Sequence, residues 1–161
     1  MTSLFILAGI AVATILLALF LRVNSIVLFT SVAVGDLLMR YMGENASLVV
    51  ASAYRGANAD IIAKLGLLLI PVVLTLLFSR HSVSKAKAIL HLVPIIATGI
   101  VLALLILTQL PSGFQNSVYS SKYGNQIKEN QDLAIAAAGV ASLVVAWITN
   151  ETSKSKHGKK H

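Results

Sequence analysis

Residues 4–21 read LFILAGIAVATILLALFL and contain no charged side chain. A helix of this length rises about 27 Å, close to the roughly 30 Å hydrocarbon thickness of a bilayer. A run that is apolar on every face is typical of a transmembrane helix, because a surface helix of a soluble domain carries a polar face. No basic residue precedes the run, and no small-residue cleavage pattern follows it before Arg22. We therefore expect an uncleaved first span and not a signal peptide.

Four further apolar runs follow the first one. They cover residues 26–42, 61–78, 88–110 and 133–148. The last run rises only about 24 Å, so it crosses a bilayer only if Asp132 and Asn150 approach the headgroups or the bilayer thins. The sequence predicts an all-α, polytopic transmembrane helical bundle with five spans, or four if the last run does not cross.

The composition supports the same class. Hydrophobic residues make up 57% of the 161 positions and charged residues 12%, whereas soluble domains lie near one half and one quarter. The apolar runs use up most of the chain, which predicts one transmembrane domain over residues 1–150 and a basic tail over residues 151–161. Cysteine is absent, which excludes disulfides, thiolate metal sites and cysteine nucleophiles.

The polar connectors predict how the spans are joined. The turn at residues 22–25 makes the first two helices a hairpin. Glycine and polar residues at 43–45 are expected to end the second helix, and residues 46–55 are too short to span, which predicts a short interfacial helix between spans two and three. Asp60 is a plausible N-cap for the third span. Residues 114–131 form the longest polar segment outside the membrane.

Basic residues choose the orientation, because cytoplasmic loops carry an excess of lysine and arginine. One side of a five-span chain holds eight of them: Arg22, Arg80, Lys85, Lys87, Lys154, Lys156, Lys159 and Lys160. The other side holds five: Arg40, Arg55, Lys64, Lys122 and Lys128. We expect the N-terminus outside and the C-terminus in the cytoplasm, in a cytoplasmic membrane.

The most informative polar residue is Asp36, eleven residues into the second run. An ionised side chain near the bilayer centre costs about 2.5–3.5 kcal/mol on insertion scales, so some partner must offset that cost. Arg40 lies four residues later on the same helix face, which makes an ion pair geometrically available. Two interpretations stay open with equal weight: a proton or ion site, and a structural ion pair that fixes helix packing.

Other residues form a second tier of candidates. His91 lies near the inner end of the fourth span, but its ten-residue spacing from His81 matches no metal motif, and we expect no metal site. Lys64 lies in the first turn of the third span, near enough to the surface to snorkel. Pro71 and Pro94 lie within the third and fourth spans and are expected to kink them.

Small residues predict close helix packing. Ser31 and Gly35 are one turn apart on the second helix. The fifth helix carries Ala134, Ala138, Ala141 and Ser142 on its small-residue face. Whether these faces pack within one chain or between chains is left open by the sequence.

The basic tail predicts contact with lipid headgroups. Lys154, Lys156, Lys159 and Lys160 follow directly on a hydrophobic segment. Positive charge in that place is typical of anionic lipid contact and not of nucleic-acid binding.

No catalytic or cofactor-binding motif is present in the sequence, so we expect neither an enzyme nor a cofactor. The leading hypothesis is a non-catalytic multi-pass protein, either a homo-oligomer or an accessory or scaffold subunit with a membrane-protein partner. The alternative is a small ion or proton channel or transporter, with Asp36 and Arg40 on the path and the kinks at Pro71 and Pro94 allowing movement.

Overall fold

The computed structural model describes residues 2–54, 56, 58–79, 82–83, 88–121 and 124–157. Over these residues the chain forms seven helices and no strand, which confirms the all-α prediction. The helices are α1 (Thr2–Phe20), α2 (Ser25–Ala53), α3 (Ala59–Phe78), α4 (Ala88–Gln109), α5 (Ser112–Tyr119), α6 (Gly124–Glu129) and α7 (Gln131–His157).

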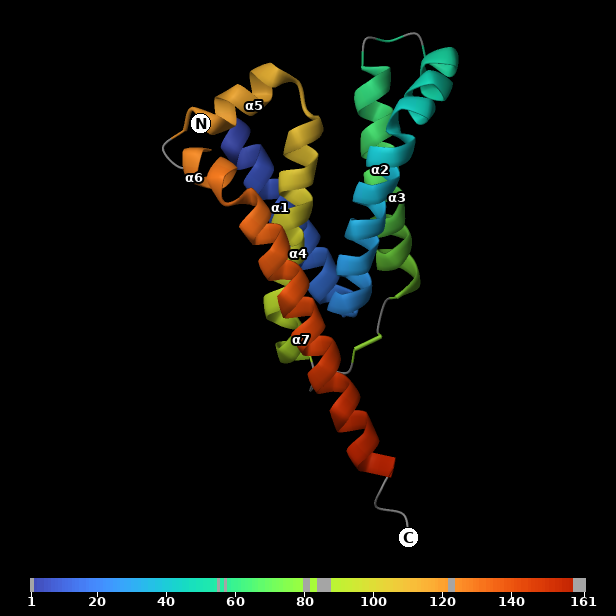
Figure 1. Cartoon of the computed structure of the whole chain (residues 1–161), viewed down its shortest axis with the longest axis vertical. Coiled ribbons are helices and arrows are strands. Elements are labelled where there is room, and N and C mark those ends of the chain that lie inside the picture. The colour runs from blue at the N-terminus through green and yellow to red at the C-terminus, as the bar shows by residue number, and fades with distance from the viewer. Residues whose placement is uncertain are drawn as a thin grey trace.

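Five of the helices in this described part, α1, α2, α3, α4 and α7, are long and apolar enough to cross a membrane. The fifth candidate span is Gln131–Ile148, eighteen residues long, because the helix begins before the apolar run does. The start of α1 and the end of α7 lie at opposite ends of the bundle (Figure 1), as an odd number of spans requires. We call these the N-terminal end and the C-terminal end of the bundle.

The prediction of a separate short helix after the second span is wrong. Helix α2 runs without a break from Ser25 to Ala53 and includes residues 43–45, where the sequence predicted an end. A glycine inside a helix lowers the stability of the helix by only about 1 kcal/mol relative to alanine. Its lack of a side chain also leaves room for a neighbouring residue. Gly43 is buried, and a methyl group built on it would lie 3.3 Å from the Cγ of Lys64. The glycine is therefore a packing position and not a helix stop.

Helix α4 is the axis of the bundle. In the candidate membrane span of α4, 67% of the residues are buried, whereas 17% are buried in those of α1, α3 and α7. Residues 101–107 are buried without interruption, which for a helix means neighbours on all sides. Helices α1, α2 and α7 each pack directly on α4, whereas α3 packs almost entirely on α2 (Figure 1).

Helices α2 and α3 form a tight antiparallel hairpin. A methyl group built on Gly35 would lie 2.5 Å from the carbonyl oxygen of Leu68, so the two backbones are in direct contact. One turn away, the hydroxyl groups of Ser31 and Thr75 form a hydrogen bond between the helices. The predicted Ser31–Gly35 face is confirmed, and it packs within the chain.

The small-residue face of α7 is also confirmed within the chain. Ala138 and Ser142 are buried, and α7 packs on α4 and α2. A methyl group built on Gly139 would lie 3.3 Å from the ring of Phe29 on α2. Ala134 and Ala141 are half-buried on the same side of the helix.

The polar segment after α4 folds into α5 and α6, which lie at the N-terminal end of the bundle (Figure 1). Helix α5 turns back over α1 and α4, and its Val118 is buried with Leu7, Ala103 and Leu107. The hydroxyl groups of Ser3 and Ser117 lie 3.0 Å apart and join α1 to α5. Much of the segment predicted as a polar loop is therefore packed on the bundle.

At the C-terminal end, the turn between α1 and α2 anchors the chain that leads into α4. The side chain of Asn24 caps α2 by accepting a hydrogen bond from the backbone N–H of Ile26 at 3.0 Å. The N–H of Asn24 donates to the Ser82 hydroxyl, and the N–H of Val83 donates to the carbonyl of Arg22. Val83 is buried at this contact, which ties the α3–α4 connector to the first hairpin.

Candidate functional site

The candidate site is the ion pair on α2. The Nε of Arg40 donates a hydrogen bond to Oδ2 of Asp36 at 2.9 Å, the geometry expected for residues four apart on a helix. The side chain of Asp36 is 20% exposed and that of Arg40 is 63% exposed. The second carboxylate oxygen, Oδ1 of Asp36, is buried and accepts no hydrogen bond from the described residues. The pair predicted from the sequence forms, but neither side chain is fully partnered by it.

The pair lies well inside α2, a helix that is long and apolar enough to cross a membrane. Asp36 and Arg40 are about 16 and 22 Å along the helix axis from Ser25, the first residue of α2. Asp36 directly follows Gly35, which touches Leu68 in the middle of α3. Asp36 therefore lies beside the middle of α3 and not at an end of the hairpin.

A second ion pair lies on α3 of the same hairpin, closer to the N-terminal end of the bundle. The Nζ of Lys64 donates to Oδ2 of Asp60 at 2.9 Å, and both residues are in the first turns of α3. Asp60 was expected to be the N-cap, but that position is taken by Asn58, and Asp60 pairs with Lys64 instead. The aliphatic stem of Lys64 lies against Gly43 of α2, so the ammonium group is held at the end of the hairpin.

His91 is the fourth residue of α4, near the end of the fourth span where the sequence placed it, and its side chain is buried. Its Nδ1 is 2.7 Å from the hydroxyl oxygen of Ser25, and both side chains are less than 5% exposed. The bond joins α4 to the first turn of α2, at the C-terminal end of the bundle. The second histidine of that prediction, His81, lies outside the described residues. Where the chain is described, no group of three His, Cys, Asp or Glu side chains is placed to hold a metal ion.

The two prolines lie inside helices, Pro71 in α3 and Pro94 in α4. Each removes one backbone N–H from its helix and so leaves a carbonyl group one turn earlier without its usual partner. The Thr75 hydroxyl, one turn after Pro71, bonds to Ser31 of α2. The Thr98 hydroxyl donates to the carbonyl of Pro94 at 2.7 Å. That these positions are kinks stays a prediction.

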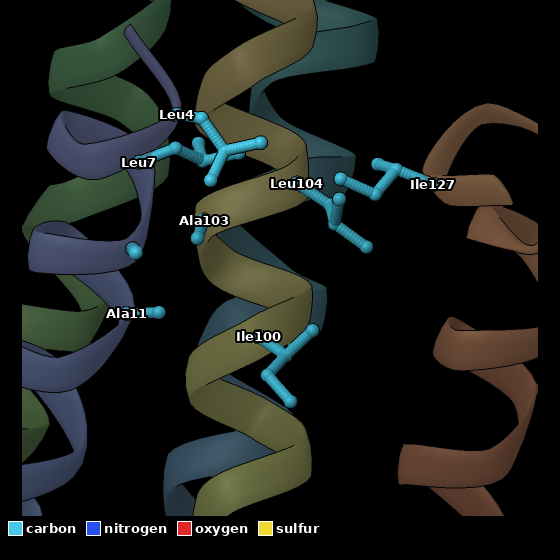
Figure 2. Close-up of a pocket in the computed structure, with 8 residues that line it drawn as sticks. Leu4, Leu7, Ala11, Ile100, Ala103, Leu104 and Ile127 are labelled. Carbon is cyan, nitrogen blue, oxygen red and sulfur yellow. The ribbon is translucent and has the colours of Figure 1, made fainter. Parts of the chain in front are cut away.

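An apolar hollow at the N-terminal end of the bundle was not found from the sequence. It measures about 320 Å³ and lies between α1, α4 and α6. Its walls are aliphatic side chains, among them Leu4, Ala8, Ala11, Ile100, Leu104 and Ile127. Figure 2 shows Ile127 pointing toward Leu104 from one flank of α4, while Leu4 and Leu7 lie at its other flank. Only the alanines at positions 8 and 11 hinted at it, because small side chains leave room between helices.

Helix α7 continues beyond the apolar run into the predicted tail. Its backbone is helical through His157, so the first seven residues of the tail continue the last helix. The side chains of Lys154 and Lys156 lie outside the described part of the structure, and so do Lys159 and Lys160 altogether. Their contact with lipid headgroups stays a prediction.

Compared with family models, curated protein sequences and solved structures, the chain gives no match to any of the three. Its function is therefore inferred from its own residues.

Proposed function

We propose that this chain is a non-catalytic multi-pass membrane protein that works by helix association, either as a homo-oligomer or as an accessory subunit of a membrane assembly. The orientation that goes with this role has the N-terminus outside and the C-terminus in the cytoplasm, in a cytoplasmic membrane. The basic residues of the tail then face the anionic inner leaflet.

The observation that carries the proposal is the incomplete pairing of Arg40. Its side chain is 63% exposed, and its Nε donates to Asp36. A guanidinium group has several N–H donors. Donors that face hydrocarbon find no acceptor there, so nothing offsets the loss of their hydration. A helix from another protomer or subunit that presents an acceptor to this face of α2 would satisfy them.

The neighbouring surface suits such a contact. Leu37 and Val34 are exposed on α2 beside the ion pair, and Tyr41 follows Arg40 at 82% exposure. Polar groups at helix interfaces in membranes stabilise association by about 0.6–2 kcal/mol each, while the surrounding apolar side chains provide packing. This face combines both elements on a single helix.

A second candidate function, an ion or proton path, is favoured by one observation. Oδ1 of Asp36 is buried and has no hydrogen-bond partner among the described residues. A buried carboxylate oxygen of this kind can accept a proton or a cation, as in the proton relays of pumps and transporters.

Cysteine cross-linking tests the association directly, because the natural chain contains no cysteine. Leu37→Cys places a thiol beside the ion pair, and Val73→Cys is the matched control at similar exposure on α3. On oxidation in native membranes, we expect a cross-linked dimer or a fixed partner with Leu37→Cys and none with Val73→Cys. Adding Arg40→Leu should remove the cross-link.

Flux measurements separate the two functions. In liposomes under ion and proton gradients, the association proposal expects no flux above empty vesicles. Flux that Asp36→Asn abolishes, in protein that still folds and assembles, would support the ion path and contradict a purely associative role. A chain that stays monomeric in membranes and co-purifies with no partner in an Arg40-dependent way would remove the association proposal.

A further inference from the structure

The apolar hollow between α1, α4 and α6 continues toward α7 as a groove. A second hollow of about 270 Å³ shares Ile100, Leu104 and Ile127 with the first and reaches Ala134 at the start of α7. Ile100 is 44% exposed, although the residues that follow it on α4 are buried. The groove is therefore a strip of the central helix that α1 and α7 leave uncovered.

The position of the groove along the candidate spans indicates that it faces lipid hydrocarbon and not water. Its α1 wall lies within the candidate span Ser3–Phe20, and its α4 wall lies within Leu90–Gln109. Every side chain along these two walls is aliphatic. A strip of this kind at membrane depth faces hydrocarbon and offers no hydrogen bond along its length.

The polar groups lie at one end only. Gln126 and Asn130 line the second hollow beneath α6, and both are exposed. The amide nitrogen of Asn130 donates to the backbone carbonyl of Gln126 at 2.8 Å, which holds that side chain on α6. An occupant of the groove is therefore apolar along most of its length and polar at the end near α6.

The charges around that end are of both signs. Within the described residues of this corner, Lys128, Glu129 and Asp132 are all exposed. The ammonium group of Lys128 lies 5.9 Å from the ring centre of Tyr119, which fixes it beside α5. These three residues flank the lining residues Ile127, Asn130 and Ala134 along the chain, and charges of both signs complement a headgroup that carries a phosphate and an ammonium group.

We propose that this groove binds one acyl chain of a zwitterionic phospholipid of the phosphatidylethanolamine type. The chain lies along Ile100 and Leu104, between α1 and α7. The carboxamides of Gln126 and Asn130 meet the ester region, and Lys128 and Glu129 meet the phosphate and the ammonium group. The bound lipid fills the strip of α4 that the other helices leave open.

Photolabelling tests the site in the full-length protein. The probe is phosphatidylethanolamine with a diazirine in its acyl chain, reconstituted with the protein and mapped by peptide mass spectrometry. We expect labels concentrated in residues 4–11, 100–104 and 126–134, and removed by excess unlabelled phosphatidylethanolamine more effectively than by phosphatidylglycerol. Labels spread evenly over all lipid-facing helices would overturn the proposal.

A pair of matched variants makes the test specific. Ala8 and Ala13 are both exposed alanines of α1, but only Ala8 lines the groove. Ala8→Phe fills it and should lower labelling about tenfold, since losing roughly two methylene contacts has that effect. Ala13→Phe should leave labelling unchanged. Equal labelling of the two variants would refute the site.

The headgroup is tested separately. The double variant Glu129→Gln/Asp132→Asn removes both acids and should shift the competition toward phosphatidylglycerol, and an unchanged preference would refute the headgroup assignment. A second copy of the chain is the competing occupant. In native membranes it would give an Ala8→Cys disulfide dimer together with no lipid label, and that result would overturn the lipid proposal.

Discussion

Gly35 and Leu68 hold α2 and α3 in backbone contact, because a methyl group on Gly35 would lie only 2.5 Å from the carbonyl oxygen of Leu68. Helix α3 has little other attachment to the bundle, since it packs almost entirely on α2. The hairpin that carries the Asp36–Arg40 pair therefore depends on the absence of a side chain at one position.

Gly35→Ala should separate the two helices and destabilise the protein. Forcing an extra methyl group into a packed contact costs about 1–3 kcal/mol, and the neighbour here is backbone that cannot rotate away. The matched control is Gly66→Ala on α3, where a methyl group meets nothing within 4 Å. That control should be neutral or stabilising by up to about 1 kcal/mol. Unfolding in detergent, followed by circular dichroism, measures both; equal stability of the two variants would contradict the close contact.

Removing one member of the ion pair should cost more than removing both. Asp36→Leu leaves the Arg40 guanidinium without its carboxylate, and we expect a loss of about 1–3 kcal/mol in the free energy of unfolding. Asp36→Leu/Arg40→Leu leaves no unpaired charge and should recover most of that loss. The same detergent unfolding, analysed as a double-mutant cycle, gives the coupling. If the losses in free energy of unfolding from the two single substitutions simply add in the double variant, the pair does not stabilise the fold.

Ser25→Ala should loosen the contact between α2 and α4. The substitution removes the hydroxyl that lies 2.7 Å from Nδ1 of His91, and a buried polar atom that loses its partner costs about 1–3 kcal/mol. Ser52→Ala on the same helix is the control, because that hydroxyl is exposed and bonds only to the carbonyl of Val49 in its own helix. The control should change stability by no more than about 0.5 kcal/mol. Thermal unfolding in detergent distinguishes them, and similar melting temperatures would show that the buried bond adds nothing.

Removing residues 154–161 should weaken anionic lipid contact without affecting insertion. Each lysine near an anionic surface contributes about 1 kcal/mol, and the truncation removes four of them. Energy transfer to labelled anionic lipid in reconstituted vesicles measures the contact, and carbonate extraction measures insertion. A variant with glutamine in place of the four lysines keeps the length and should behave like the truncation. Lipid contact that survives both changes would refute the role of the tail.

Reporter fusions should place the two termini on opposite sides of the membrane. Five candidate spans in the described chain and the excess of basic residues at the C-terminal end predict the N-terminus outside and the C-terminus inside. A fluorescent protein at the C-terminus should fluoresce, and alkaline phosphatase at the N-terminus should be active. Termini on the same side would show that one of the five helices does not cross.

Much of the fold was predictable because hydropathy is a local property. The run at residues 4–21 needs no information from elsewhere in the chain to be identified as a span, and the same holds for α3 and α4. The Asp36–Arg40 pair was predictable for a similar reason, since residues four apart on one helix meet whatever surrounds them. The small residues Ser31 and Gly35 were found as a packing face, but their partners were not.

The end of α2 shows where this kind of reasoning fails. Gly43 was interpreted as a helix stop because glycine has a low helix propensity. Its neighbour is Lys64, twenty-one positions later, and the stem of that lysine occupies the space that glycine leaves. The hydrogen-bond partner of His91 was missed for the same reason, since Ser25 belongs to a different hairpin.

By itself, then, the sequence determined the class of this protein, its five apolar helices and the Asp36–Arg40 ion pair within α2. The tertiary structure alone decided that α4 is the central helix, that α5 folds back over α1, and that a groove stays open beside Ile100. The physical reason is that hydropathy records how each residue interacts with lipid, whereas helix packing in a membrane depends on shape matching between segments distant in sequence. No single segment contains that information.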